Sequence, residues 1–123
     1  MSEQRVAVYA GSFDPPGVHH REIAALLADR FDEVIVFPHG PRADRPTADS
    51  LPVHRAVMAD LNFRGLDRVA VELGDLERGR FTPHREYARL FGGPGRAVYH
   101  VVTADGVRHG GRGQSKVHTE WSD

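Results

Sequence analysis

The sequence predicts an α/β fold in which an open parallel sheet of four strands has helices on both faces. Four short apolar runs recur along the chain, and each is nearly continuous in apolar character, as in strands buried on both faces. Helical patterns separate these runs, so strand and helix alternate at intervals of roughly 30 residues. The runs are Val6 to Ala10, Val34 to Phe37, Val69 to Val71, whose extension to Leu73 stays open, and Ala97 to Val102.

Apolar residues at helical spacing predict three helices between these strands. The first covers about His20 to Arg30, and the second begins near Ser50 with Pro52 in its first turn. The third starts at about Pro83 and ends at a glycine-rich run that begins at Gly92, which is a strong stop signal. The expected apolar faces are Ile23, Leu26, Leu27 and Phe31 in the first helix, Val53, Val57, Met58 and Leu61 in the second, and Tyr87, Leu90 and Phe91 in the third.

The composition fits one domain, residues 1–123, that acts on small molecules. The chain is 40% hydrophobic and 27% charged, its formal net charge is -1, and it has no cysteine. A near-neutral charge argues against a surface that coats nucleic acid, and the lack of cysteine excludes disulfides and thiolate zinc sites. No apolar run approaches the roughly 20 residues that span a bilayer, so we expect no membrane partner and a cytoplasmic address.

The segment after the first predicted strand has the features of a phosphate site. Gly11 and Ser12 end the strand and place backbone N–H groups just before a predicted helix, and such a turn suits an anion. Asp14 can hold the turn through backbone hydrogen bonds. His19 and His20 would project from the first helical turn, where an imidazolium would stabilise charge on a transferred phosphoryl group. The alternative is a generic turn followed by surface histidines.

The stretch GSFDPPGVHH resembles the signature of the nucleotidyltransferase superfamily, G-[TS]-F-D-P-x-[HT]-x-G-H. The likeness is closest to the nicotinate or nicotinamide mononucleotide adenylyltransferases, which implies a Rossmann-like fold with the Val6 strand central and the Val69 strand outermost. It also implies adenylyl transfer from ATP to the mononucleotide in NAD biosynthesis, with Mg²⁺ entering with ATP. The resemblance makes His20 the catalytic residue and assigns nucleotide or phosphate binding to Gly11, Ser12, Phe13, Asp14, Gly17 and His19.

Further segments resemble the same family in order and spacing. VIVFPHGPRADRP resembles the family's second strand and the loop after it, and places Arg45 at a phosphate-contacting basic residue, although a solvated loop charge is an equal alternative. VHRAVM matches a family helix and contains Arg55, for which a structural role is favoured. The resemblance assigns mononucleotide binding to Thr82, Thr103, Asp105 and Trp121, of which Trp121 would stack on the pyridine ring.

Three departures from the family pattern lead to further expectations. Gly17 replaces the first histidine of the motif, and His19 replaces its glycine, so the imidazole at 19 would crowd the adenine and His19→Gly would leave activity unchanged or raise it. The chain ends at Asp123, where relatives continue through another strand and the triphosphate clamp. The resemblance therefore implies a domain that is incomplete at its C-terminus and leaves three alternatives open: a fragment of a longer chain, a dimer in which a second copy covers the sheet edge, or a degraded relative.

Two other functions stay open at this stage. One is a non-catalytic or degenerate nucleotide-binding domain, and the other is an adenylyltransferase for a different phosphorylated acceptor, such as pantetheine phosphate. Both would use similar phosphate contacts, so the motif does not separate them from the first.

Overall fold

The computed structural model describes residues 3–13, 15–40 and 51–102. No helix in these three segments is long and apolar enough to cross a bilayer. In chain order the elements are β1 (Gln4–Gly11), α1 (Val18–Ala28), β2 (Glu33–Pro38), α2 (Pro52–Phe63), β3 (Val69–Val71), α3 (Gly74–Arg78), the single 3-10 turn η1 (His84–Glu86), α4 (Tyr87–Phe91) and β4 (Arg96–Val101).

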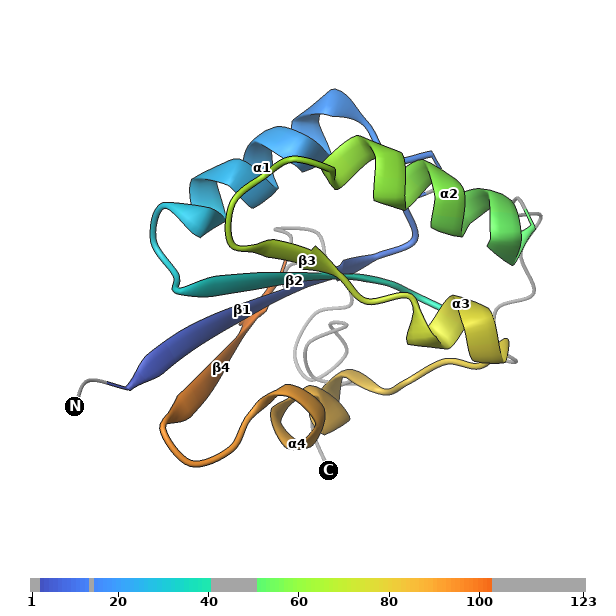
Figure 1. Cartoon of the computed structure of the whole chain (residues 1–123). Coiled ribbons are helices and arrows are strands. Elements are labelled where there is room, and N and C mark those ends of the chain that lie inside the picture. The colour runs from blue at the N-terminus through green and yellow to red at the C-terminus, as the bar shows by residue number, and fades with distance from the viewer. Residues whose placement is uncertain (1–2, 14, 41–50, 103–123) are drawn as a thin grey trace, which may run out of the picture.

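The four strands form one parallel sheet in the order β3-β2-β1-β4, which confirms the predicted central position of the first strand (Figure 1). β1 is paired along its length on both sides, with Val8 opposite Ile35 of β2 and His100 of β4. Val6, Ala7 and Val8 are at most 1% exposed, because helices cover both faces of this strand. The apolar run of β1 is therefore continuous because both faces of the strand are buried, as the sequence predicted.

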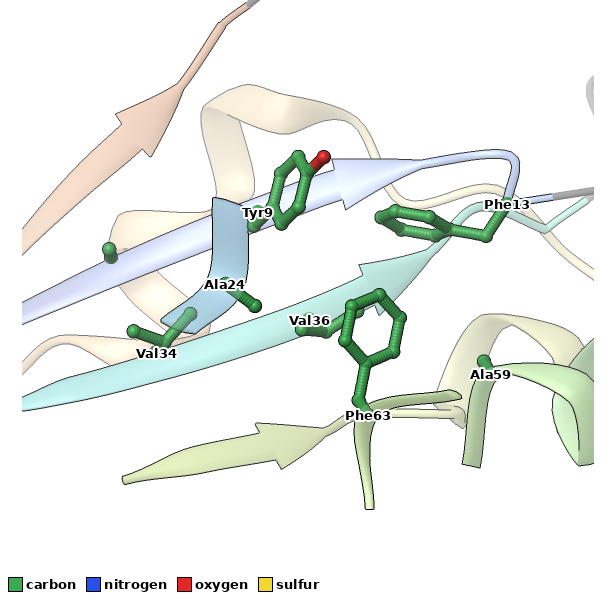
Figure 2. Packing of buried hydrophobic residues seen from close by; sticks show 8 residues of the cluster. Tyr9, Phe13, Ala24, Val34, Val36, Ala59 and Phe63 are labelled. Atoms are coloured by element: carbon green, nitrogen blue, oxygen red, sulfur yellow. The ribbon is translucent and has the colours of Figure 1, made fainter. Parts of the chain in front are cut away.

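Helices α1 and α2 cover one face of the sheet, and α4 lies against the other (Figure 1). On the first face the rings of Phe13 and Phe63 pack edge to face at 5.6 Å, beside Tyr9 of β1 and the small Ala24 and Ala59 of the helices (Figure 2). Small residues on the helices allow close approach to the sheet. The smaller cluster on the other face contains Val8, Phe37 and Tyr87.

The expected buried face of α2 is wrong. Val53, Val57 and Leu61 are each more than half exposed, whereas the side that faces the sheet carries Arg55, Ala59 and Phe63. Both sets recur every four residues, so spacing alone does not distinguish them. The sheet side is selected because Arg55 reaches the carbonyls of Ser12 and His39 there. The sequence also predicts Leu26 of α1 and Leu90 of α4 on buried faces, but they are 63% and 48% exposed.

β3 covers Val69–Val71 as predicted, without the extension to Leu73 that the sequence left open. Leu73 instead precedes the short helix α3, which was not predicted. Gly79 ends α3 in the left-handed conformation that suits glycine, with φ of 66°. The third predicted helix is divided into the turn η1 and α4.

Candidate functional site

The turn after β1 is built around a buried phenylalanine. Phe13 has φ of 47°, an unusual backbone conformation for a residue other than glycine, and its ring is 4% exposed. Edge-to-face contacts join this ring to Tyr9 at 5.4 Å and to His20 at 5.1 Å. The packing of the ring offsets the strain of the backbone, so Phe13 reverses the chain between Gly11 and the start of α1.

The first turn of α1 holds His20 in one orientation. Gly17 precedes the helix, and its backbone N–H donates to Nδ1 of His20 over 2.8 Å. Because Nδ1 accepts this hydrogen bond, the neutral ring carries its proton on Nε2, which has no partner among the described residues. Within that same part of the chain, the N–H groups of Val18 and His19 also have no acceptor. Three donors therefore lie in one helical turn.

The electrostatics of His20 favour the neutral ring in the free protein. Burial lowers the pKa of His20 below its usual 6.5, and the positive charge that His19 can carry lowers this pKa further. The rings of His19 and His20 are close, with centroids 3.9 Å apart. In the free protein His20 therefore presents a neutral Nε2–H donor, and the contact of an imidazolium with phosphate stays a prediction.

Arg55 joins the turn after β1 to the loop after β2. Its side chain is only 4% exposed, and Nε and Nη2 donate to the carbonyl oxygen of Ser12 over 3.1 and 2.7 Å. Nη2 also donates to the carbonyl oxygen of His39 over 2.7 Å. Both carbonyls lie just beyond the carboxyl ends of neighbouring strands. The structural role that the sequence favoured for Arg55 is thus to hold these two ends together.

Asp75 extends this network to the segment that contains Thr82. The carboxylate of Asp75 is fully buried, and Oδ2 accepts the backbone N–H of Gly40 over 3.2 Å and that of Thr82 over 2.8 Å. The hydroxyl of Thr82 donates to Oδ1. Thr82 therefore supports the loops in the first instance, and its oxygen keeps only an acceptor role for a ligand.

A group of aromatic rings and histidines lies beside this network. Nε2 of His39 and Nε2 of His84 are 3.3 Å apart, and the His84 ring contacts Tyr87 at 5.2 Å. Tyr87 in turn stacks with His100 of β4. Burial lowers the pKa of His100 below 6.5. No group of three or more potential metal ligands occurs within the described segments.

A separate cleft of about 360 Å³ lies between β2, β3 and α4. Its lining includes the carboxylates of Glu33 and Glu72, the side chain of Arg96, and the apolar Ile35 and Phe91. None of the predicted site residues that the structure describes lines this cleft.

The structure brings one predicted set of site residues together and leaves another outside its described segments. Gly11, Ser12, Phe13, Gly17, His19 and His20 form the single turn that joins β1 to α1, and the hydrogen bonds of Arg55 and Asp75 connect it to Thr82. The predicted residues Asp14, Arg45, Thr103, Asp105 and Trp121 lie outside the described residues.

The sequence analysis missed Asp75, His39 and His84. Their partners are distant in sequence, since Asp75 contacts Gly40 across 35 positions and His39 contacts His84 across 45. An isolated acid or histidine gives no sign of such a contact. The one available signal was the position of His39 and Asp75 after predicted strands, where parallel sheets collect functional groups, and His84 gave none.

No protein-family model matches the chain. Similarity to curated proteins is nevertheless found. The chain is 39% identical over 77 residues to a probable nicotinate-nucleotide adenylyltransferase of Albidiferax ferrireducens, a match that covers 61% of this chain and 39% of that protein. It is 31% identical over 83 residues to a probable nicotinate-nucleotide adenylyltransferase of Campylobacter fetus, covering 66% of this chain and 46% of the relative. These matches span less than half the length of either relative.

Solved structures of similar proteins have the same fold. Plasmodium falciparum nicotinic acid mononucleotide adenylyltransferase complexed with NaAD superposes with a TM-score of 0.59 at 21% identity, covering 79% of this chain and 50% of that one. A putative nicotinate-nucleotide adenylyltransferase from Vibrio parahaemolyticus gives a TM-score of 0.57 at 17% identity, covering 85% of this chain and 63% of that one. Over these matched segments the chain is a relative of the nicotinate-nucleotide adenylyltransferases, which are nucleotidyltransferases, and it has their Rossmann-like parallel fold.

Proposed function

We propose that this domain transfers the adenylyl group of ATP to nicotinate mononucleotide or nicotinamide mononucleotide, giving a dinucleotide and pyrophosphate for NAD biosynthesis. The observation that carries the proposal is the turn between β1 and α1. There the N–H groups of Val18 and His19 and Nε2 of His20 are three donors within one helical turn. Such donors suit phosphate oxygens, and similarity to adenylyltransferases makes a nucleotide the preferred source of those phosphates.

In the proposed reaction a phosphate oxygen of the mononucleotide attacks the α-phosphorus of ATP, and the bond from that phosphorus to the pyrophosphate oxygen breaks. The protein's work is to position the two phosphates and to stabilise the charge that develops between them. His20 does so by donating from Nε2, while Gly17 holds the ring through Nδ1. Gly11 allows the ligand to approach the main chain, and Arg55 fixes the Ser12 carbonyl beside it.

Within the described segments the turn presents hydrogen-bond donors, which suit the phosphates of a nucleotide. Mg²⁺ would enter with ATP, whose phosphate oxygens would be its main ligands and whose charge it would neutralise.

For the mononucleotide we propose contacts from Thr82, Thr103, Asp105 and Trp121, and for phosphate a contact from Arg45. The support for Thr82 is its connection to the turn through Asp75, Gly40, His39 and Arg55. The other four residues rest on the sequence resemblance. We also retain the proposal that a second copy of the chain covers the open edge of the sheet.

A nucleotide-binding domain without catalysis is the second candidate. The specific observation in its favour is the replacement of two motif positions by Gly17 and His19. An adenylyltransferase for another acceptor, such as pantetheine phosphate, differs from the main proposal only in the substrate that must be supplied.

The test combines calorimetry with an assay of product formation. We expect nicotinate mononucleotide to bind measurably, ATP to bind more weakly, and the dinucleotide to accumulate when Mg²⁺-ATP and the mononucleotide are mixed with the chain. His20→Ala should lower kcat by roughly 100-fold with little change in mononucleotide affinity, because its hydrogen bond strengthens mainly in the transition state. Binding without product favours the second candidate, product only with pantetheine phosphate favours the third, and no binding of either nucleotide contradicts the proposal.

A further inference from the structure

The backbone conformation at position 17 would allow a side chain, but the ring of His19 lies close to where its Cβ atom would be. Its φ of -118° and ψ of 176° describe an extended backbone that any residue adopts. A Cβ atom at this position would nevertheless lie 3.0 Å from both Nδ1 and Cε1 of His19. This distance is shorter than most real Cβ contacts, so the His19 ring lies over position 17 and would have to shift by a few tenths of an ångström to admit a side chain there.

The same ring is in contact with His20. The centroids of the two imidazoles are 3.9 Å apart, and their planes are tilted by 39°. His20 is held by Gly17 through Nδ1 and by the edge of Phe13, so its position is set independently of His19. His19 is exposed, and its ring nitrogens make no hydrogen bond to the described residues. Two imidazoles with available N–H groups therefore lie side by side.

We propose that His19 is a second imidazole that contacts the nucleotide phosphate, placed over position 17 from two residues further along the chain. The glycine at 17 makes room for this ring, so Gly17 and His19 act as one matched pair. This inference rests on the proposed function and specifies the ligand chemistry as a phosphate group bound between two imidazole donors. It predicts that His19→Gly weakens nucleotide binding, whereas the family resemblance predicts unchanged or higher activity for this variant.

The test is a double-mutant cycle between positions 17 and 19. The probes are α,β-methylene ATP, which cannot donate its adenylyl group, and nicotinate mononucleotide, each titrated by calorimetry and followed by ¹H–¹⁵N NMR. His19→Ala should weaken binding of at least one probe by about 5- to 10-fold, the value of one hydrogen bond. Gly17→Ala, which shifts the ring, should weaken binding of the same probe to a smaller degree and have no effect in the His19→Ala background.

Two further variants complete the design. The exchange Gly17→His with His19→Gly places an imidazole directly on position 17 and should restore the affinity to within about threefold of the parent, since one donor replaces another. His54→Ala is the matched control, because His54 is also an exposed histidine in the first turn of a helix. Its affinities should equal those of the parent. Thermal unfolding of each variant separates loss of contact from loss of fold.

The outcomes distinguish this inference from the proposed function. If the parent binds a probe and His19→Ala binds it equally well, the inference is wrong and the proposed function stands. Independent effects of Gly17→Ala and His19→Ala also overturn it. If the parent binds neither probe, the proposed function fails and the inference fails with it.

Discussion

Replacing Arg55 by methionine tests whether the buried guanidinium holds the site together. The change removes three hydrogen bonds, two to the carbonyl of Ser12 and one to that of His39, and leaves the apolar stem in place. Hydrogen bonds from charged donors contribute roughly 1.5–3 kcal/mol, but methionine also removes the cost of burying the cation, so we expect a net loss of about 2–4 kcal/mol. The free energy of unfolding, measured by urea denaturation at pH 7, gives this value.

The same substitution should also weaken nucleotide binding, because Ser12 and the loop after β2 lose their common anchor. Arg55→Lys is the matched control, since it keeps the charge but cannot donate to both carbonyls in a planar fork, and we expect an intermediate loss of stability. The reasoning is refuted if Arg55→Met changes the free energy of unfolding by less than about 0.5 kcal/mol, the range of ordinary surface substitutions.

Three further predictions concern the support of the site. Asp75→Ala should destabilise the fold by about 1–3 kcal/mol, because it leaves the N–H groups of Gly40 and Thr82 without their common acceptor, and equal urea midpoints for variant and parent would contradict this. Gly40→Ala should lower the melting temperature strongly, since its Cβ would lie 1.9 Å from the carbonyl oxygen of Arg80; an unchanged melting curve would show that the loop has space. The pKa of His20 is lowered on folding, so its stabilising contribution is complete above pH 6.5 and is lost as the pH falls through the lower folded value. The free energy of unfolding of the parent, measured with urea at several pH values, should fall over this range, and that of His20→Gln should fall less. Identical pH profiles for the two proteins would exclude a contribution from His20.

The sequence predicted the sheet because burial on both faces leaves a direct pattern. In β1 the run from Val6 to Val8 has no polar position, and only a central strand requires that. The turn with His20 was also predictable, because its parts are neighbours in sequence. The face of α2 was not, since Val53 and Arg55 each begin a repeat of four residues, and only the position of the Ser12 carbonyl selects between them.

The supporting network was beyond sequence reasoning for a related reason. Asp75 acts on Gly40, and His84 lies against His39, through contacts that exist only once the loops after β2 and α3 have met. A buried acid surrounded by backbone donors looks in sequence like any solvated carboxylate. The positions of loops beyond the strand ends thus decide which isolated polar residues become part of a site.

Mapping of bound nucleotide by ¹H–¹⁵N NMR shows whether the turn between β1 and α1 binds phosphate. We predict that nicotinate mononucleotide, or Mg²⁺-ATP at higher concentration, shifts the backbone amides of Gly11, Ser12, Gly17 and His19 in a saturable manner. His20→Ala should leave the mononucleotide shifts of Gly11 and Ser12 in place and reduce those close to position 20. Saturable shifts confined to the separate cleft at Ile35 and Phe91, or none with either nucleotide, would contradict the claim that the turn between β1 and α1 binds phosphate.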